Sequence, residues 1–334
     1  MEHSPPPARP APEPVIAEPL TPPDDEADAA RSLAVAGAFA MGIIGPLLAS
    51  IPSAIPLLVA RGRGAAPDSL WQAMARPEAI AVSLVLGALG TVLVVAIPRR
   101  FRWREMAERY AIRWPPLDFK TYALMVAGSM LLILGSGSLG SALVKLHVLP
   151  DFALSKALLG LVQAMEHAPW PLFFAIGLAH ALGPGITEEL MFRGHVQRGL
   201  RARFSPLAAI ATTSALFAAW HGHPVRIVLA FGGGCWLGWI AWRCDATGPG
   251  MIVHALTNFL YFTGSTGYRR LRHTPMATHD RWPLTQSLLV FVTCALLTVW
   301  IARLLTKRLP DAPELREGPA SSDPPPAMPA ERLS

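Results

Sequence analysis

The sequence predicts an all-α polytopic membrane protein with about eight transmembrane helices. Only 16% of the 334 residues are charged, whereas a soluble domain carries about 25%. Hydrophobic residues make up 52% of the chain and are grouped in blocks of about 20 residues, the length that crosses a bilayer. The net charge of +6 comes from cations between these blocks, and no basic motif is interleaved with aromatic residues. Nucleic acid is therefore not a predicted partner.

The apolar blocks form eight predicted spans of two kinds. The first three and the last are uniformly apolar, whereas the four between them contain nearly all the intramembrane polar residues and several glycines, which let helices approach closely. A further helix over 151–167 is predicted to be amphipathic and to lie at the membrane interface. The predicted spans are 33–60, 79–98, 121–144, 172–199, 205–221, 225–243, 249–265 and 284–305.

Both ends of the chain are rich in proline, and the N-terminal end is also acidic, as in "PPDDEAD". This composition predicts disordered tails over residues 1–32 and 309–334. The start of the chain lacks the basic region and short apolar stretch of a signal peptide. Between the tails we expect N-terminal membrane helices with a basic loop (33–168), a polar core (169–267), and a loop with the last span (268–308).

The distribution of Lys and Arg predicts the orientation in the membrane. Three basic segments face the cytoplasm if both termini are cytoplasmic, which needs an even number of spans. One loop, "GYRRLRH" around Arg269, would then lie outside, against the rule. The Ala-, Pro- and Arg-rich style of the chain is typical of bacteria, so the expected location is a bacterial inner membrane. The basic segments are "RRFRWREMAERYAIR", the group Arg198, Arg201 and Arg203, and the group Arg303, Lys307 and Arg308.

The segment "ITEELMFRGH" places two carboxylates and a cation inside an apolar chain. Glu189 and Arg193 are four residues apart, so on a helix they share a face and are predicted to form an ion pair. Glu188 points about 100° away and has no partner in the local sequence. It is therefore the candidate general base or acid. The alternative is that both glutamates only hold the helix bundle together.

Two further segments add polar groups to neighbouring spans. "FAAWHGH" contains His221, and "MIVHALTNFL" places His254 and Asn258 on one helical face. Each also has a structural interpretation, as a hydrogen-bonded core histidine or as an asparagine that links helices. We interpret Arg226 and Arg243 as anchors at the membrane boundary. His180 lies two turns before Glu188 and could face the same cavity, but it is interpreted as a packing residue.

Taken together, these groups have the chemistry to hydrolyse an amide. A carboxylate and a histidine can take a proton from water, and a second histidine with an asparagine can hold the oxyanion. The same groups can ligate a divalent metal such as zinc, although the pattern H-E-x-x-H of soluble zinc proteases is absent. No cofactor is favoured, and zinc stays an open alternative.

The segments "EELMFR" (188–193), "FAAWH" (217–221) and "HALTN" (254–258) match the motifs E-E-x-x-x-R, F-x-x-x-H and H-x-x-x-N in order and spacing. Residues of about 170–265 therefore resemble the CAAX-processing and bacteriocin-processing (CPBP, or Abi) intramembrane proteases. This family includes the eukaryotic Ras-converting CAAX endopeptidase and the bacterial myxosortase group. The chain departs from it at Pro249 and Gly250, where relatives more often have Ser-Leu; we expect this to affect only the start of the helix.

The resemblance implies a catalytic core over residues 169–267, with the site in a cavity within the bundle. It implies that Glu188 and His221 activate water. Glu189 and Arg193 would orient and support the site, and His254 and Asn258 would stabilise the oxyanion. The family has been described both as metal-dependent and as glutamate-based. A metal-free mechanism is favoured here because the two imidazoles and the carboxylate suffice for the proton transfers.

The predicted function is an intramembrane endopeptidase that cuts near the C-terminal or membrane-proximal part of a membrane-associated protein or peptide. Its expected partners are this substrate and the lipid bilayer. Two alternatives stay open. One is a non-catalytic membrane scaffold or bacteriocin-immunity protein of the same fold. The other is a proton-coupled transporter, since intramembrane Glu and His also form proton relays, but no internal inverted repeat supports it.

Overall fold

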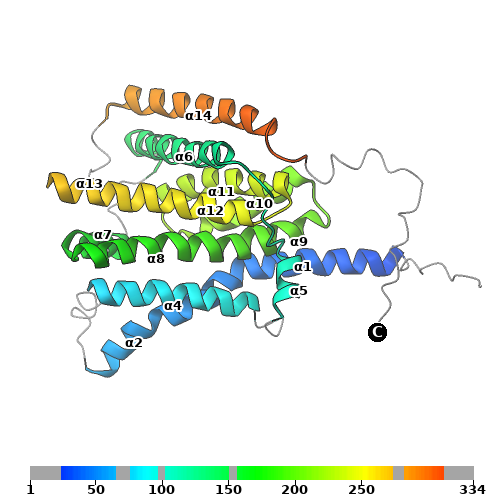
Figure 1. Ribbon diagram of the computed structural model, residues 1–334, viewed down its shortest axis with the longest axis horizontal. Helices are drawn as coiled ribbons and strands as arrows, with labels where there is room; N and C mark the ends of the chain where they lie inside the picture. The colour runs from blue at the N-terminus through cyan, green and yellow to red at the C-terminus, as the bar shows by residue number, and fades with distance from the viewer. Residues whose placement is uncertain (1–23, 65–75, 97–101, 150–155, 274–281, 312–334) are drawn as a thin grey trace, which may run out of the picture.

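The computed structural model describes residues 24–64, 76–96, 102–149, 156–273 and 282–311. All regular structure in these ranges is helical, and the long helices lie side by side along one axis (Figure 1). Six helices are long and apolar enough to cross a membrane, which confirms an all-α polytopic membrane protein. These spans are Asp28–Gly62, Pro77–Ala96, Phe119–Lys145, Trp170–Arg201, Pro224–Cys244 and Leu284–Thr306.

The first span is a bent helical run rather than one straight helix. It consists of α1 (Asp24–Ser50), a 3₁₀ turn (Ile51–Ala54) and α2 (Ile55–Gly62). Proline residues explain the breaks, because they lack the N–H that continues the hydrogen-bonded ladder. The helix begins at Asp24, so residues 24–32 are helical and the expected boundary of the tail at 32 is wrong. Residues 1–23 lie outside the described ranges.

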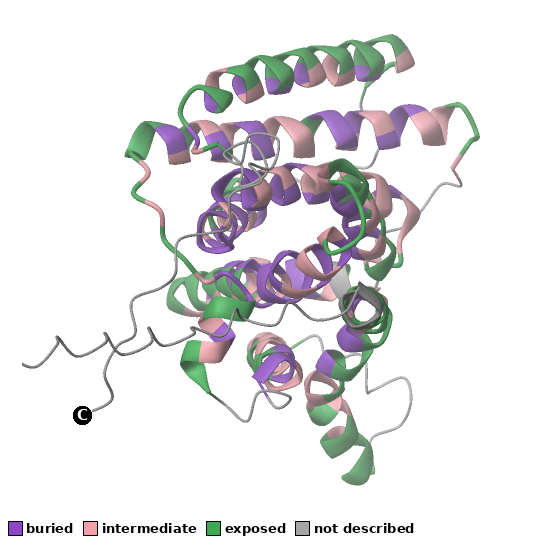
Figure 2. Cartoon of the chain, turned by 90° about the vertical axis from the view of Figure 1, so that its right-hand side faces the viewer, coloured by how far each residue is buried: buried purple, intermediate pink, exposed green. Residues whose placement is uncertain are grey.

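The next helices form the outer part of the bundle. They are α4 (Pro77–Ala96), α5 (Trp103–Arg109), α6 (Phe119–Lys145) and, at the end of the chain, α14 (Leu284–Thr306), which packs on α6. Buried residues face the middle of the bundle and exposed residues its rim (Figure 2). On α14 the exposed side chains include Leu289, Leu296 and Trp300, which is the pattern of a helix that faces lipid.

The core helices carry the predicted site. Helix α8 (Trp170–Glu188) continues into a π-helical segment (Glu189–Gln197) and α9 (Arg198–Arg201). After α10 (Pro206–Trp220) and α11 (Pro224–Cys244), α12 (Gly248–Asn258) continues into a second π-helical segment (Phe259–Thr263) and α13 (Gly264–Arg272). A helix is present within the predicted range 151–167, as α7 (Lys156–His167), packed on α4, α8 and α13; residues 150–155 before it are not described.

The expected number of eight spans is not confirmed. Helix α10 has 15 residues, about 22 Å at 1.5 Å per residue, which is shorter than the roughly 30 Å hydrocarbon core. The run from α12 to α13 is continuous, but it is not among the six apolar candidate spans. The fifth and seventh predicted spans are therefore helices of the bundle without the length or the composition of a plain membrane span.

Small residues bring α8 and α12 into direct contact. Gly177, Ala181 and Gly185 recur every four residues on one face of α8, the spacing that allows close helix packing. A Cβ built on Gly185 would lie 2.9 Å from the backbone N and Cα of Ala255 in α12, and one on Gly177 would overlap the hydroxyl of Thr263 in the π-helical segment that follows α12. This contact sets the residues that follow Gly185 beside those that precede Ala255, where the predicted site residues lie.

We expect Gly185→Ala to separate these two helices, because the added Cβ meets backbone atoms that cannot rotate away. The cost of such overpacking is about 1–3 kcal/mol, and a displacement of 1 Å at the site lowers activity about 100-fold. Thermal unfolding in detergent and a cleavage assay measure the two effects. Gly183→Ala is the matched control, since its Cβ would meet only Ala88 at an ordinary 3.5 Å. Equal behaviour of the two variants would contradict this account of the packing.

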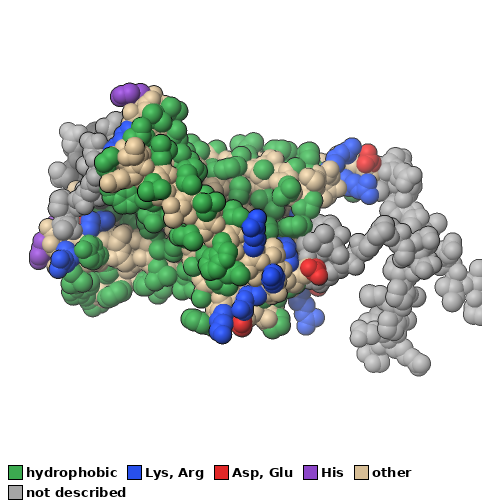
Figure 3. All heavy atoms as spheres, turned by 90° about the horizontal axis from the view of Figure 1, so that it is seen from above, with side chains coloured by type: hydrophobic (Ala, Val, Ile, Leu, Met, Phe, Trp, Pro, Cys, Tyr) green, Lys and Arg blue, Asp and Glu red, His purple; other side chains and the backbone are tan. Residues whose placement is uncertain are grey.

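One end of the bundle gathers several basic segments. The Asp245 carboxylate accepts hydrogen bonds from Arg113 and Arg198, at 3.0 and 2.9 Å. Arg203 donates to Ser32, which brings the start of α1 to the same end. Figure 3 shows Lys and Arg toward the ends of the elongated body, with a mainly hydrophobic surface between them.

The start of the expected C-terminal tail also packs at this end. Arg243, interpreted from the sequence as a membrane anchor, is buried and donates to the carbonyls of Thr306, Leu309 and Pro310. Leu309 itself is buried. The expected tail boundary at 309 is therefore wrong, because residues 309–311 are ordered on the bundle. Residues 312–334 lie outside the described ranges.

Candidate active site

A buried ion pair forms the base of the site. The Arg193 guanidinium donates to Oε1 of Glu189 at 2.8 Å, and both side chains are fully buried. The other guanidinium nitrogen donates to the Gly234 carbonyl at 3.1 Å, and the group lies 4.6 Å from the centre of the Phe217 ring. The predicted pairing of Glu189 with Arg193 is confirmed. The carbonyl and the ring add a hydrogen bond and a cation–π contact to it.

His254 connects the two glutamates. Its Nδ1 lies 2.8 Å from the same Oε1 of Glu189, and its Nε2 lies 3.9 Å from Oε2 of Glu188. Because a carboxylate accepts, Nδ1 carries the proton and Nε2 is the atom presented to Glu188. Glu188 is partly exposed, at 21% of its side chain, whereas Glu189 is fully buried. The sequence predicts the ion pair of Glu189 with Arg193, but it does not predict the hydrogen bond between Glu189 and His254.

His221 is held in a similar way by the backbone of its own helix. It follows α10 directly, and its Nδ1 lies 2.9 Å from the carbonyl oxygen of Phe217. A carbonyl only accepts, so Nδ1 is the donor and Nε2 keeps its lone pair. The Phe217 ring packs edge-on against His221 and His254, with centroids 4.9 and 6.2 Å apart. Phe217 therefore positions both imidazoles.

The helices change from α to π at the site, which the sequence does not predict. The first π-helical segment begins directly after Glu188, and the second begins directly after Asn258. A π-helix bonds residues five apart, so its turn is wider than an α-turn, and such segments are frequent at functional sites. The 100° rotation assumed from the sequence for Glu188 and Glu189 belongs to a regular α-helix and does not hold beyond this point.

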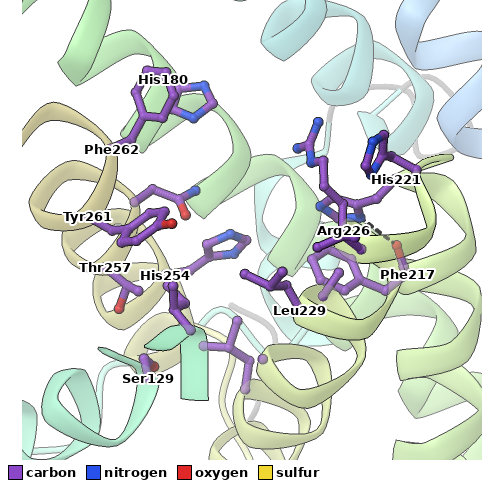
Figure 4. Close-up of a pocket in the computed structure, with 17 residues that line it drawn as sticks. Ser129, His180, Phe217, His221, Arg226, Leu229, His254, Thr257, Tyr261 and Phe262 are labelled. Atoms are coloured by element: carbon purple, nitrogen blue, oxygen red, sulfur yellow. Dashed lines mark hydrogen bonds between the residues drawn. The ribbon is translucent and has the colours of Figure 1, made fainter. Parts of the chain in front are cut away.

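A cavity of about 290 Å³ lies beside this network. Figure 4 shows His254 in its middle, His180 and Tyr261 on one side, and His221 and Arg226 on the other. Asn258 also lines it, whereas neither glutamate belongs to the lining that the described residues form. Glu188 lies next to His254, which lines the cavity. Glu188 also interacts electrostatically with His221 and Arg226. The structure thus brings all six predicted site residues to one region of the bundle.

Two further residues line the cavity. His180 lines it and also packs against the Phe262 ring, with centroids 4.5 Å apart, so both sequence-based interpretations of His180 fit the structure. Arg226, interpreted from the sequence as a boundary anchor, lines the cavity as well. The position of His180, two turns before Glu188 on the same helix, is the signal by which the sequence suggests that it faces the cavity. The sequence around Arg226 does not indicate that it faces the cavity, because Arg226 lies two residues after Pro224 at the start of a predicted span.

The side chains at the site are of the chemical types that bind zinc, but they are not arranged as zinc ligands. Imidazole and carboxylate are ordinary zinc ligands, and a catalytic zinc needs three protein ligands at about 2.0–2.2 Å. Within the described ranges no three His, Cys, Asp or Glu side chains lie close enough together to hold one ion. His254 uses Nδ1 for Glu189, and its Nε2 is 3.9 Å from Glu188. As arranged, these residues do not form a three-ligand zinc site.

Residues 169–260 match the family model described as type II CAAX prenyl endopeptidase, Rce1-like. This segment belongs to the CAAX protease family. The match contains all three motifs and confirms the resemblance seen in the sequence. It assigns the core to the CAAX-type intramembrane proteases as a class, which act as peptide hydrolases on membrane-associated substrates. Searches of curated proteins and of solved structures gave no match for the chain.

The departure at Gly250 reaches further than the start of α12. A Cβ built there would lie 3.0 Å from Oε2 of Glu189, so the expectation that this change affects only the start of the helix is wrong. That oxygen is buried and has no hydrogen-bond partner among the described residues. The glycine makes room for the carboxylate that holds His254.

We expect Gly250→Ala to displace the Glu189 carboxylate by a few tenths of an ångström and to lower the cleavage rate about tenfold. Stability should change little, because alanine is the better helix former by about 1 kcal/mol. Steady-state kinetics and thermal unfolding check both parts. Gly264→Ala is the control, since its Cβ would meet nothing within 4 Å. An unaltered rate in Gly250→Ala would show that the glycine is not needed by Glu189.

Proposed function

We propose that the protein is an intramembrane endopeptidase that hydrolyses a peptide bond near the C-terminal or membrane-proximal part of a membrane-associated protein or peptide. One observation carries the proposal. Glu188 and His254 meet beside the cavity, and His254 is held from behind by the buried pair of Glu189 and Arg193. A carboxylate and an oriented imidazole at an apolar cavity are what hydrolysis of a bound peptide requires.

In the proposed reaction Glu188 takes a proton from water as the water oxygen attacks the carbonyl carbon of the scissile bond. His221 assists, because its Nδ1 is occupied by the Phe217 carbonyl and its Nε2 can accept a proton. The carbonyl oxygen becomes an oxyanion. The C–N bond then breaks, and the proton held by Glu188 passes to the leaving nitrogen.

His254 and Asn258 are proposed to hold the oxyanion. When both ring nitrogens of His254 are protonated, Glu189 is its counter-ion and Nε2–H donates into the cavity. Asn258 lies one turn later on the same helix and lines the same cavity. Its side-chain NH₂ group would be the second donor. Glu189 and Arg193 act through His254 and are positioning residues.

The reaction is proposed to need no metal, because the two histidines and Glu188 account for each proton transfer. Elemental analysis of the purified protein and cleavage after treatment with a chelator test this point. We expect activity to persist without stoichiometric zinc. Loss of activity on chelation, with recovery when zinc is added back, would overturn the metal-free mechanism but leave the protease function intact.

The experiment that tests the function compares the membrane proteomes of cells that carry the wild-type protein or the Glu188→Gln variant. We expect a small set of membrane-associated proteins to keep their C-terminal segments only in the variant. Identical termini in the two strains, with an unchanged phenotype, would favour a scaffold or immunity role. Uptake by proteoliposomes under a pH gradient is the corresponding test of a transporter.

The proposed location is a bacterial inner membrane with both termini in the cytoplasm. The gathering of basic segments at the end of the bundle that also contains the start of α1 and residues 309–311 supports this orientation. Labelling of single cysteines introduced at Arg31 and at Arg272, in intact and permeabilised cells, tests it. We expect Arg31→Cys to be protected in intact cells and Arg272→Cys to react.

A further inference from the structure

A polar cavity of about 510 Å³ lies at the basic end of the bundle and shares no lining residue with the candidate active site. Helix α5, the π-helical segment after Glu188 and α9 provide its charged groups, and α1 contributes Ala34. The charged groups are two carboxylates, two guanidinium groups and one imidazole, which belong to Glu105, Glu108, Arg109, Arg198 and His195. The proposed reaction uses none of them.

An apolar groove of about 580 Å³ continues along α1 from the polar cavity, with α4 as its other wall. Ala34 lines the polar cavity, and Gly37, one turn later, lines the groove. Met41, Ile44 and Leu48 follow at intervals of three or four residues, so these positions share one face of α1. From Gly37 to Leu48 the groove runs about 16 Å, close to the roughly 15 Å depth of one leaflet of the hydrocarbon core. Ile44 and Leu48 are exposed, so a lipid can reach the groove.

Exposed tryptophans place the polar cavity at the membrane surface. Trp103 begins α5 and Trp114 follows it, and both side chains are exposed. Tryptophan is enriched at the level of the lipid headgroups. The groove lies between the apolar spans Asp28–Gly62 and Pro77–Ala96, which reach into the hydrocarbon core. A charged cavity at headgroup depth, followed by an apolar groove as long as one leaflet is thick, matches the polarity and the length of a phospholipid.

The arginines of the polar cavity suit a phosphate. The Asp245 carboxylate accepts hydrogen bonds from Arg113 and Arg198. Arg201 lies 3.9 Å from the same carboxylate, so three guanidinium groups share one acid and positive charge is in excess beside the cavity. Arg198 also lines the cavity, and Arg109 adds a second guanidinium to the lining. Guanidinium groups form paired hydrogen bonds with phosphate oxygens.

The carboxylates of the same cavity indicate what the other end of the headgroup carries. The Glu108 carboxylate has no hydrogen bond or ion pair with another described residue, and Glu105 pairs with the exposed Arg102. A headgroup that is only anionic would be repelled by both carboxylates. A primary ammonium donates three N–H bonds to such acceptors, whereas the quaternary ammonium of choline has no N–H and prefers an aromatic cage. The mixed charge therefore favours a zwitterionic headgroup of the ethanolamine type.

We propose that the polar cavity and the groove together bind one phospholipid whose headgroup carries a primary ammonium, as in phosphatidylethanolamine. The phosphate lies against Arg109 and Arg198, and the ammonium lies against Glu105 and Glu108. One acyl chain lies in the groove between α1 and α4. The lipid then joins α1 and α5 to the helical run that starts at Glu189, so it supports the segment that carries the buried ion pair of the site.

Competitive binding tests the proposal without any cleavage. The full-length protein is purified in detergent, stripped of lipid, and mixed with equal amounts of phosphatidylethanolamine, phosphatidylcholine and phosphatidylglycerol that carry the same acyl chains. Native mass spectrometry then counts the lipids that each protein molecule keeps. We expect one phosphatidylethanolamine per protein, bound about 10-fold more tightly than either of the others, because these cannot donate N–H bonds to the carboxylates. Tighter binding of phosphatidylglycerol, or no preference among the three lipids, would overturn the proposal.

Removal of the two carboxylates tests the ammonium site. In Glu105→Gln/Glu108→Gln the preference for phosphatidylethanolamine over phosphatidylcholine should disappear, because the ammonium has lost its acceptors. Glu78→Gln is the control, since it removes an exposed carboxylate at the far end of α4, and it should keep the preference. A preference that survives the loss of both cavity carboxylates would contradict the assignment of the ammonium.

Removal of the two arginines tests the phosphate site. Arg109→Gln/Arg198→Gln should weaken the binding of phosphatidylethanolamine and phosphatidylcholine by a similar factor of about 10, because both lipids carry the phosphate. Arg104→Gln is the control, since it removes an exposed cation of α5 that does not line the cavity, and it should bind both lipids as the wild type does. Unchanged binding by the double variant would show that the phosphate does not lie there.

A larger side chain at Gly37 tests the groove. A Cβ built there meets nothing within 4 Å, so Gly37→Leu should fold normally and place its side chain where the acyl chain would lie. We expect it to weaken the binding of phosphatidylethanolamine about 10-fold, the effect of displacing about two methylene groups. Gly137→Leu is the matched control, because its Cβ also meets nothing within 4 Å but lies on α6, outside the groove. Equal binding by the two variants would overturn the placement of the acyl chain.

Discussion

Replacement of Glu188 by Gln is expected to lower the rate of peptide cleavage about 10³-fold, within the 10²–10⁴ range that a general base supplies. Glutamine has the shape of glutamate but cannot take a proton from water. The side chain is 21% exposed and has no ion-pair partner closer than His254 at 3.9 Å, so its loss should leave the fold intact. Cleavage of a reporter substrate by purified protein, with helix content and thermal unfolding measured alongside, checks both parts.

The control for this variant is Glu166→Gln. Glu166 is also a partly buried glutamate, with 29% of its side chain exposed, but it pairs with Arg269 at 3.4 Å and does not line the cavity. Its replacement should leave the cleavage rate within about twofold of wild type, because surface pairs contribute little. Retention of full activity by Glu188→Gln would remove the carboxylate from the mechanism.

Replacement of Glu189 by Leu is expected to destabilise the protein by about 3–5 kcal/mol, the cost of leaving one member of a buried ion pair without its partner. The Arg193 side chain is fully buried, and it would keep only the Gly234 carbonyl and the Phe217 ring. His254 would also lose the carboxylate that orients it, so cleavage should fall as far as in Glu188→Gln. Thermal unfolding in detergent and the cleavage assay measure the two losses.

The double variant Glu189→Leu/Arg193→Met separates stability from catalysis. With both charges removed, an apolar pair fills the space and much of the stability should return. Activity should not return, because His254 still lacks its partner. Arg102→Met is the control, since the ion pair of Arg102 with Glu105 is exposed and is expected to contribute about 0–1 kcal/mol to the free energy of unfolding. A double variant that regains cleavage would show that Glu189 serves only to neutralise Arg193.

The sequence predicts those parts of the site that depend on spacing along one helix. The four-residue interval between Glu189 and Arg193 is enough to predict their ion pair. The bond from Glu189 to His254 joins residues 65 positions apart, and it depends on how closely α8 and α12 approach. That approach is set by single glycines such as Gly185, whose importance appears only when the facing backbone is known.

Other differences between the prediction and the structure arise from local backbone conformation, which amino-acid composition does not indicate. The π-helical turns after Glu188 and Asn258 follow no pattern of apolar residues. The acidic, Pro-rich composition near Asp24 predicts disorder, yet the chain is already helical there. Arg226 lies at the start of a predicted span and is interpreted as a boundary anchor, yet it lines the cavity inside the bundle. Helix α10, which precedes it in the chain, has only 15 residues and is shorter than the hydrocarbon core.

The short α10 also has a consequence for hydration. Its 15 residues reach about 22 Å, so if α10 starts at one membrane surface, the turn at Gly222, which has a positive φ of 64°, falls short of the other. Irregular backbone at that depth persists only where protein covers it or where it lines a wet cavity. Gly222 is exposed, and the imidazole of His221 next to it lines the cavity. We therefore expect the short helix to leave a path for water, the one reactant that a lipid environment withholds from a hydrolase.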